Sequence, residues 1–239
     1  MQTQIKLIHR KHRGHYGAPR IAAELGVSQT TVRRYMKELG LRSRRRKKHV
    51  VTTDSKHNYL VCENFLNRRF NDYFPHGAWV SDITFIPTTD GWLYKTVIID
   101  LEDRKAIGYS FSKGLTAEET TITAFRRAVK IRPPQKGLIF HSDRGVQYCC
   151  YDFANLLEKY DITRSMSRKG DCWDNAVAES FFKTLKVELI YETPLVSRER
   201  MELMLFEYIE TYYNKTRRHS ALKNLTIDEF TKLNYKNVA

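Results

Sequence analysis

The segments HSDRGVQY at residues 141–148 and GDCWDNAVAESFFKTLKVE at residues 170–188 decide the fold expected for this chain. An apolar run at residues 138–140 precedes the first segment and predicts a short buried strand that ends just before Asp143. The second segment predicts a helix around Glu179 with four apolar residues on one side, namely Ala178, Phe182, Leu185 and Leu189. A carboxylate at a strand end and another on an adjacent helix can converge, and they then need a cation because close carboxylates repel each other.

The predicted helix has a polar start and a polar second face. Asp174 and Asn175 stand where a helix-capping pair is expected. Glu179, Lys183 and Lys186 share one side of the helix at about 100° per residue. Because Lys183 lies four residues beyond Glu179, it fits an intrahelical ion pair, and it is also a candidate DNA contact.

A third acid lies upstream, in AWVSDITFIP at residues 78–87. Apolar residues on both sides of Asp82 predict a buried strand. Three acids from two strands and a helix form an oxygen-only site suited to Mg²⁺ or Mn²⁺. Such ions promote in-line phosphoryl transfer. Asp100, which also follows an apolar run, is the best alternative for the first acid.

These blocks carry a family resemblance that covers most of the chain, from about His15 to Phe230. Thirty-five residues separate Asp143 from Glu179, and Lys186 follows seven residues later. With HSDRGVQY and DNAVAESFF around the acids, this spacing resembles the OrfB, or integrase-like, transposase of insertion-sequence family three. The core of that family is similar to retroviral integrases.

The resemblance implies a DNA transposase whose catalytic and metal-binding residues are Asp82, Asp143 and Glu179. As a hypothesis, two Mg²⁺ or Mn²⁺ ions activate water, and later a DNA 3′-hydroxyl, and stabilise the departing oxygen. Lys186 is interpreted as a phosphate contact and His141 as a positioning residue near the site. Strand cleavage at the element's ends and strand transfer follow, with no covalent protein–DNA intermediate. A homo-oligomer on DNA is implied, together with an upstream OrfA-type protein or fusion.

The order of the predicted elements indicates a ribonuclease-H-like α/β fold. Three antiparallel strands, a helix, and then strand, helix, strand and helix predict a mixed five-stranded sheet with helices on both faces. The expected divisions are a helix-turn-helix segment at 1–40, a basic linker and helical lead-in at 41–76, an integrase core at 77–192, and a C-terminal helical segment at 193–239.

The N-terminal 40 residues predict a helix-turn-helix unit. Pro19 can open one helix that ends near Gly26, and Ser28 can cap the next. This second helix is expected to present four residues to DNA, namely Gln29, Thr30, Arg33 and Arg34. A helical hairpin packed on the core is the alternative. The linker adds Arg44, Arg45, Arg46 and Lys47, which indicate phosphate contacts, although a merely solubilising linker stays open.

Composition favours a nucleic-acid partner. The 41 Lys and Arg residues exceed the 27 Asp and Glu residues and give a net charge of +14, which predicts a polyanionic partner with nucleic acid as the leading candidate, although a generally basic soluble protein stays open. The resemblance implies that this partner is double-stranded DNA, namely the transposon ends and the target, and that the protein is cytoplasmic in a bacterium and associated with the nucleoid. The cysteines form no C-x-x-C pair, which is typical of reduced thiols in a cytosolic protein. No apolar run approaches 18 residues, so membrane spanning and secretion are not expected.

A second class of function stays open at this point. Family members commonly begin some tens of residues earlier, so a truncated copy could act as a non-catalytic DNA-binding regulator of the insertion sequence. Metal-dependent cleavage separates the two interpretations. A ribonuclease-H-like RNA nuclease shares the fold but does not explain the helix-turn-helix unit.

Overall fold

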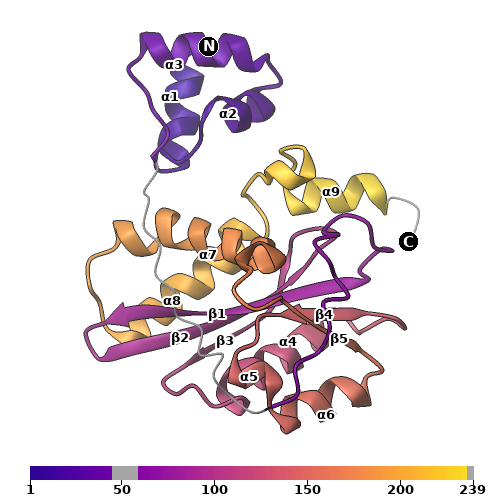
Figure 1. Ribbon diagram of the computed structural model, residues 1–239. Helices are drawn as coiled ribbons and strands as arrows, with labels where there is room; N and C mark the ends of the chain where they lie inside the picture. Colours follow the sequence, from indigo (N-terminus) through magenta and orange to yellow (C-terminus); the bar gives the residue numbers. More distant parts are fainter. Residues whose placement is uncertain (45–58, 236–239) are drawn as a thin grey trace.

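The computed structural model describes residues 1–44 and 59–235, and a mixed five-stranded sheet forms its centre (Figure 1). The strands are β1 (Ala78–Thr88), β2 (Gly91–Asp100), β3 (Ala106–Ser112), β4 (Ile139–Ser142) and β5 (Thr163–Met166). Their order across the sheet is β3-β2-β1-β4-β5. The predicted ribonuclease-H-like sheet is therefore confirmed.

The sheet is antiparallel on one side of β1 and parallel on the other. β1 and β2 form an antiparallel hairpin, and β3 continues the antiparallel pairing. β4 pairs with β1 in parallel, and β5 pairs with β4 in parallel. Both parallel connections pass through helices, as parallel pairing requires.

Helices cover both faces of the sheet (Figure 1). One face packs against α7 (Ala176–Glu188), α8 (Arg198–Glu207) and the π-helix η4 (Tyr208–Tyr213). The other face packs against η1 (Glu118–Ile122), α4 (Thr123–Ile131), α5 (Val146–Cys149) and α6 (Tyr151–Lys159). Short 3₁₀ turns η2 (Cys172–Asn175), η3 (Ile190–Glu192) and η5 (Ser220–Leu222) precede or follow these helices, and α9 (Ile227–Asn234) ends the described chain.

Alternation along β1 decides which residues face which helices. Val80 and Ile86 belong to the core beneath α7, whereas Trp79 belongs to the core beneath α4. Since successive side chains of a strand point to opposite faces, Asp82 lies on the α7 face. On the opposite face α4 comes very close to the sheet, because a Cβ on Gly108 of β3 would lie 2.4 Å from the Ala124 carbonyl oxygen.

The N-terminal residues form a separate small helical core. It consists of α1 (Gln2–Lys11), α2 (Ala18–Leu25) and α3 (Gln29–Glu38). The predicted signals hold: Pro19 lies in the first turn of α2, Gly26 ends it with a left-handed φ of +67°, and the Ser28 hydroxyl accepts from the Thr31 amide at 3.1 Å.

Three polar contacts tie this small domain to the C-terminal half of the chain. His12 Nδ1 lies 3.0 Å from the Tyr212 hydroxyl, and the Arg218 amide donates to the Tyr16 hydroxyl at 2.8 Å. The Arg44 guanidinium pairs with Glu192 at 2.5 Å. The N-terminal helices therefore dock on the segment that follows α7.

Two local predictions were wrong. The helical lead-in does not form in its described part, because residues 59–77 contain turns and bends only. Asn67, Arg68 and His76 have positive φ angles there, which a helix cannot include. Asp174 does not cap α7, since its side chain accepts hydrogen bonds from arginines instead. Asn175, the other member of the predicted pair, stands at the N-cap position, but its side chain makes no capping hydrogen bond.

A buried ion pair fixes the far end of α7. Glu188 and Arg217 have side chains only 5% and 6% exposed. Arg217 Nη2 donates to Glu188 at 2.9 Å, and the Tyr208 hydroxyl donates to the same carboxylate at 2.7 Å. Burial opposes the charge of Glu188, but Arg217 outweighs it and lowers the pKa of the carboxyl.

No helix in the described ranges 1–44 and 59–235 is long and apolar enough to cross a membrane.

Substitution Arg217→Ala should destabilise the protein strongly, by about 3–5 kcal/mol, because it leaves the Glu188 charge buried and unpaired. Urea denaturation measures the free energy of unfolding. Arg126→Ala is the control, since Arg126 pairs with Glu118 on the exposed surface and should matter little. Equal losses in the two variants would contradict the assigned role of the buried pair.

Candidate active site

The parallel register of β1 and β4 places two of the predicted acids level with each other. Val80 of β1 is paired with His141 of β4. Two residues further along each strand direction stand Asp82 and Asp143. Asp143 is the first residue after β4, whereas Asp82 lies within β1, so the two carboxylates lie where β4 ends beside β1. A shift of register by one residue would separate them.

Backbone amides hold one oxygen of each aspartate. The Ile83 amide donates to Asp82 Oδ1 at 2.8 Å, and the Gly145 amide donates to Asp143 Oδ1 at 3.0 Å. A Cβ on Gly145 would lie 3.1 Å from that same Oδ1, so a larger residue would press on the carboxylate. The glycine in HSDRG therefore leaves room for the carboxylate of Asp143.

The third acid reaches the same place from α7. Asn175, at the start of this helix, donates from Nδ2 to the Ser81 carbonyl at 2.9 Å, immediately before Asp82. The helix buries Ala178, Phe182 and Leu185 against the sheet, as predicted. Glu179 is half-buried, one turn beyond Asn175. The hydrogen bond from Asn175 to Ser81 fixes the start of α7 on β1, and with it the position of Glu179 relative to Asp82.

The electrostatics of Asp82 show that the three acids share one environment. Burial raises the pKa of Asp82 well above its ordinary value, and the negative charges of Asp143 and Glu179 raise it further. Lys186 opposes this shift only weakly. Lys186 is half-buried, and burial lowers the pKa of its ammonium while Asp82 raises it. The structure thus brings Lys186 to the acids, and their repulsion is only partly compensated.

Tyr148 lies behind the two aspartates and was missed by the sequence analysis. Its hydroxyl lies 2.7 Å from Ser81 Oγ, which donates its own proton to the Val97 carbonyl at 2.8 Å. Tyr148 must therefore be the donor to Ser81. Burial and the charges of Asp82 and Asp143 raise the pKa of this phenol. The one sequence feature that could have indicated Tyr148 is its place as the last residue of the segment HSDRGVQY.

His141 is fully buried in β4 instead of lining the site. Its Nδ1 lies 2.8 Å from Ser165 Oγ and its Nε2 lies 3.2 Å from Ser167 Oγ. Burial lowers the pKa of the imidazole to about 4, so the ring is neutral near pH 7. With both nitrogens engaged by serines at β5, His141 joins β4 to β5 below Asp143.

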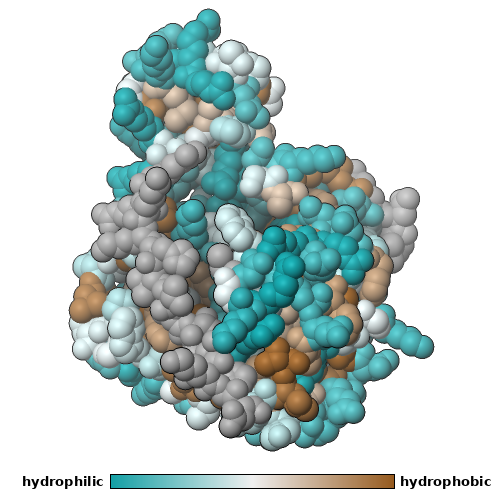
Figure 2. Space-filling view, viewed as in Figure 1, coloured by the Kyte–Doolittle hydropathy of each residue, from teal (hydrophilic) through white to brown (hydrophobic). Residues whose placement is uncertain are grey.

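The predicted DNA-contact residues divide into three groups. Gln29, Thr30, Arg33 and Arg34 are all exposed on α3, and Lys183 is exposed on α7. In Figure 2 hydrophilic residues cover much of the visible surface of the N-terminal helices. Arg44 is engaged with Glu192. The remaining predicted contacts, Arg45, Arg46 and Lys47, lie outside the described residues.

Comparison with known proteins supports the class that the fold and the acids define, a ribonuclease-H-like integrase core. Two family descriptions named integrase core domain match residues 72–172 and 160–226, and one named HTH-like domain matches residues 1–49. A chain of a simian T-cell lymphotropic virus intasome has the same fold, with a TM-score of 0.50 at 15% identity over 87% of this chain and 69% of that one.

Curated relatives identify the family. The chain is 39% identical over 224 residues to transposase InsF for insertion sequence IS3A of Escherichia coli, covering 92% of this chain and 77% of the relative. It is also 39% identical over 231 residues to the 31 kDa protein of insertion element IS600 of Shigella sonnei, covering 95% and 85%. The chain belongs to the IS3 family of transposases, with an integrase-type catalytic core.

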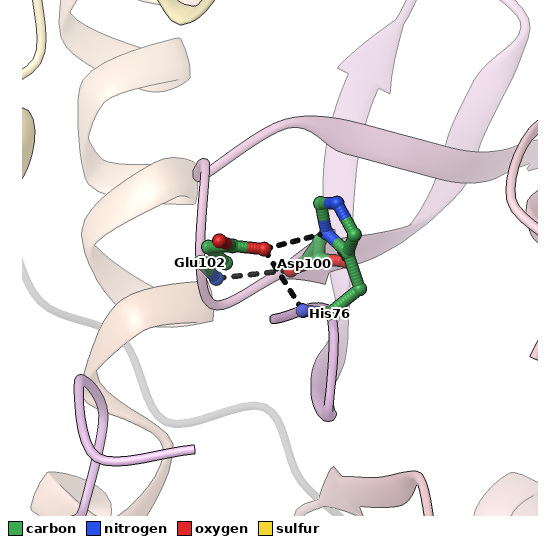
Figure 3. A group of neighbouring side chains, drawn as sticks. All are labelled: His76, Asp100 and Glu102. Atoms are coloured by element: carbon green, nitrogen blue, oxygen red, sulfur yellow. Dashed lines mark hydrogen bonds and ion pairs between the residues drawn. The ribbon is translucent and has the colours of Figure 1, made fainter. Parts of the chain in front are cut away.

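A second polar cluster lies near the start of β1, where β2 ends (Figure 3). His76 Nδ1 lies 3.0 Å from Asp100 and 2.9 Å from Glu102. These donor types could hold a metal ion, all within 4.8 Å of one another. The Arg132 guanidinium already pairs with Asp100 at 2.6 Å and compensates part of the negative charge that a metal ion would balance. Asp100, the alternative first acid, is thus committed to an ion-pair network.

The His76 cluster predicts a pH dependence of stability. The hydrogen bond to Asp100 raises the pKa of His76 despite burial, so the imidazolium stabilises the fold fully below about pH 6.5. That stabilisation is lost as the pH rises through the raised pKa. His76→Asn, which tolerates the φ of +58°, should cost about 1–2 kcal/mol at pH 6 and less at pH 9.

Urea denaturation of the two proteins at a series of pH values measures this difference. Taking the difference removes the contribution of the other histidines. A cost that stays constant from pH 6 to pH 9 would contradict the proposed imidazolium.

Proposed function

We propose that this chain cleaves phosphodiester bonds at the ends of an insertion sequence and transfers the strands to target DNA, with Asp82, Asp143 and Glu179 as the catalytic, metal-binding carboxylates. One observation carries the proposal. The charges of Asp143 and Glu179 both act on Asp82, in keeping with the β1–β4 register, which pairs the residues two positions before each aspartate. The relatives named as transposases support the reaction class.

The donor set fits divalent cations such as Mg²⁺ or Mn²⁺. All three groups are carboxylates, which these hard ions prefer. Burial is the largest cause of the raised pKa of Asp82, and the negative charges of Asp143 and Glu179 raise it further, so an added cation would be favoured there. When bound there, two such ions supply the charge that activates the attacking oxygen and stabilises the leaving one.

The residues of the chain take distinct roles in this proposal. The amides of Ile83 and Gly145 hold Asp82 and Asp143 in fixed orientations. Lys186 contacts a DNA phosphate beside the acids, since its half-buried ammonium lies within the field of Asp82. His141 acts as a positioning residue through its bonds at β5 and takes no proton, being neutral and enclosed.

The N-terminal domain supplies the sequence reading in this proposal. The exposed side of α3 presents Gln29, Thr30, Arg33 and Arg34 to the major groove, while the basic linker and Lys183 contact phosphates. Two ends must be held together for transfer, so we propose a homo-oligomer on DNA. Cooperation with an upstream OrfA-type protein stays a prediction.

Substitution Asp143→Asn should abolish metal-dependent nicking of labelled DNA that carries the flanking element's ends. The carboxylate is worth several kcal/mol of transition-state stabilisation, so a loss of about 10³-fold or more is expected. Cleavage and joining are measured on denaturing gels with Mn²⁺ or Mg²⁺. Asp152→Asn, an exposed acid on α6, is the matched control and should cut normally.

DNA binding should survive in both variants, because α3 is untouched. If the wild type binds the ends but never cuts them, with or without metal, the chain is a DNA-binding regulator and the catalytic proposal is wrong. Equal cutting by wild type and Asp143→Asn would instead exclude the three acids as the site.

A further inference from the structure

Trp173 is an exposed tryptophan at the entrance to α7. Its side chain is 68% exposed, whereas Trp79 in β1 is 1% exposed. It lies in the turn η2, between Asp171 and the first residue of α7. Leaving an indole in water forgoes the free energy that burial of a large apolar side chain would provide. A single exposed aromatic residue is common on protein surfaces, so the groups around Trp173 decide whether it has a binding role.

The turn that presents Trp173 is firmly anchored. Its neighbour Asp174 is fully buried and accepts from Arg168 Nη2 at 2.7 Å and from Arg68 Nε at 2.7 Å. The Arg168 amide also donates to Asp174 at 2.9 Å. These bonds lower the pKa of Asp174, with Arg168 as the largest cause. Because the buried Asp174 is fixed by these hydrogen bonds, the turn keeps a conformation in which the Trp173 side chain is exposed.

The same turn adjoins the acids. Asn175, two residues beyond Trp173, donates to the Ser81 carbonyl at 2.9 Å, and Ser81 precedes Asp82. Asn175 Oδ1 is buried and has no hydrogen-bond partner within the described parts of the chain. Trp173 therefore stands at the edge of the carboxylate site, on the turn that leads into the helix carrying Glu179.

Cationic side chains belong to the loop that carries Trp173 and to its anchor. Arg68 and Arg168 keep 43% and 51% of their side chains exposed while they bind Asp174. Lys169 is exposed in the same loop. Arg68, Arg168 and Lys169 outnumber Asp171 and Asp174, the two acids of the turn with which the arginines pair, and the carboxylates of the candidate site lie beyond it. An aromatic face within a cationic rim is the arrangement that binds single-stranded nucleic acid, through stacked bases and contacted phosphates.

We infer that Trp173 stacks on an unpaired base of the DNA end being processed, and that Arg68, Arg168 and Lys169 contact the phosphates beside it. The inference rests on the proposed function and deepens it, since the ring would hold a frayed end next to Asp82 and Glu179. Opening the terminal pairs is necessary because a stacked base inside a duplex cannot reach the indole. Stacking of this kind tolerates any base sequence.

The test uses the full chain carrying Asp143→Asn, so that the DNA stays intact. The probe is a duplex with a three-nucleotide single-stranded end and 2-aminopurine at the first unpaired position. Stacking on Trp173 should quench its fluorescence. Trp173→Ala should lose the quench and bind the frayed duplex about 5- to 100-fold more weakly, as expected for one stacked base.

Three controls isolate the ring. Trp173→Phe keeps an aromatic face and should retain most of the quench. Trp92→Ala removes another exposed tryptophan, 53% exposed near the β1–β2 turn, and should change nothing. A blunt duplex without unpaired bases should bind Trp173→Ala and its parent equally. Because Trp173 is on the surface, the free energy of unfolding should stay unchanged.

Equal quenching in Trp173→Ala and its parent overturns the inference. So does a change of sedimentation coefficient in Trp173→Ala without a change of quench, since the ring would then be a contact between protein copies. Cleavage by the chain with Asp143 intact reports separately on the proposed function. Normal metal-dependent cutting with no effect of Trp173 leaves that function standing, whereas a Trp173-dependent quench without cutting leaves only the base contact.

Discussion

The parallel pairing of β1 with β4 is the constraint on which the candidate active site depends. It sets Val80 beside His141, and two residues later it sets Asp82 beside Asp143. No attraction between the aspartates holds them there, since each raises the cost of the other's charge. The energy comes from the apolar cores on both faces of the sheet and from the buried serine bonds of His141 that join β4 to β5. The fold supports a locally unfavourable cluster, as is typical of functional sites.

The helix that carries Glu179 is held at both ends by polar groups. At its start Asn175 binds the Ser81 carbonyl, and Asp174 anchors the preceding turn through Arg68 and Arg168. At its end Glu188 binds Arg217, which belongs to the segment that also contacts the N-terminal helices. The DNA-binding and catalytic parts of the chain therefore meet at one end of α7. A mechanical link between DNA binding and the site would pass through this junction.

Periodicity and turn chemistry predicted the sheet, the α7 face and the helix-turn-helix caps, because these depend on neighbours close in sequence. Contacts between distant residues could not be read that way. Its neighbours in the sequence suggest that Asp174 caps a helix. In the structure its buried side chain instead accepts a hydrogen bond from Arg68, over a hundred positions earlier. Lys95 looks like a surface residue but is fully buried, with its Nζ 5.0 Å from the ring centroids of Tyr109 and Phe111, and burial lowers its pKa. The three acids were predicted as the site because the blocks that flank them are distinctive.

Binding of Mn²⁺ to the protein without DNA, followed by electron paramagnetic resonance, tests most directly whether the three acids form one site. Asp82→Asn, Asp143→Asn and Glu179→Gln should each weaken the same binding event, while His76→Asn should leave it unchanged. Weakening by all three changes is the predicted result. Unchanged binding in the three variants would contradict a shared carboxylate site. Binding lost only with His76→Asn would also place the ion at the Asp100 cluster.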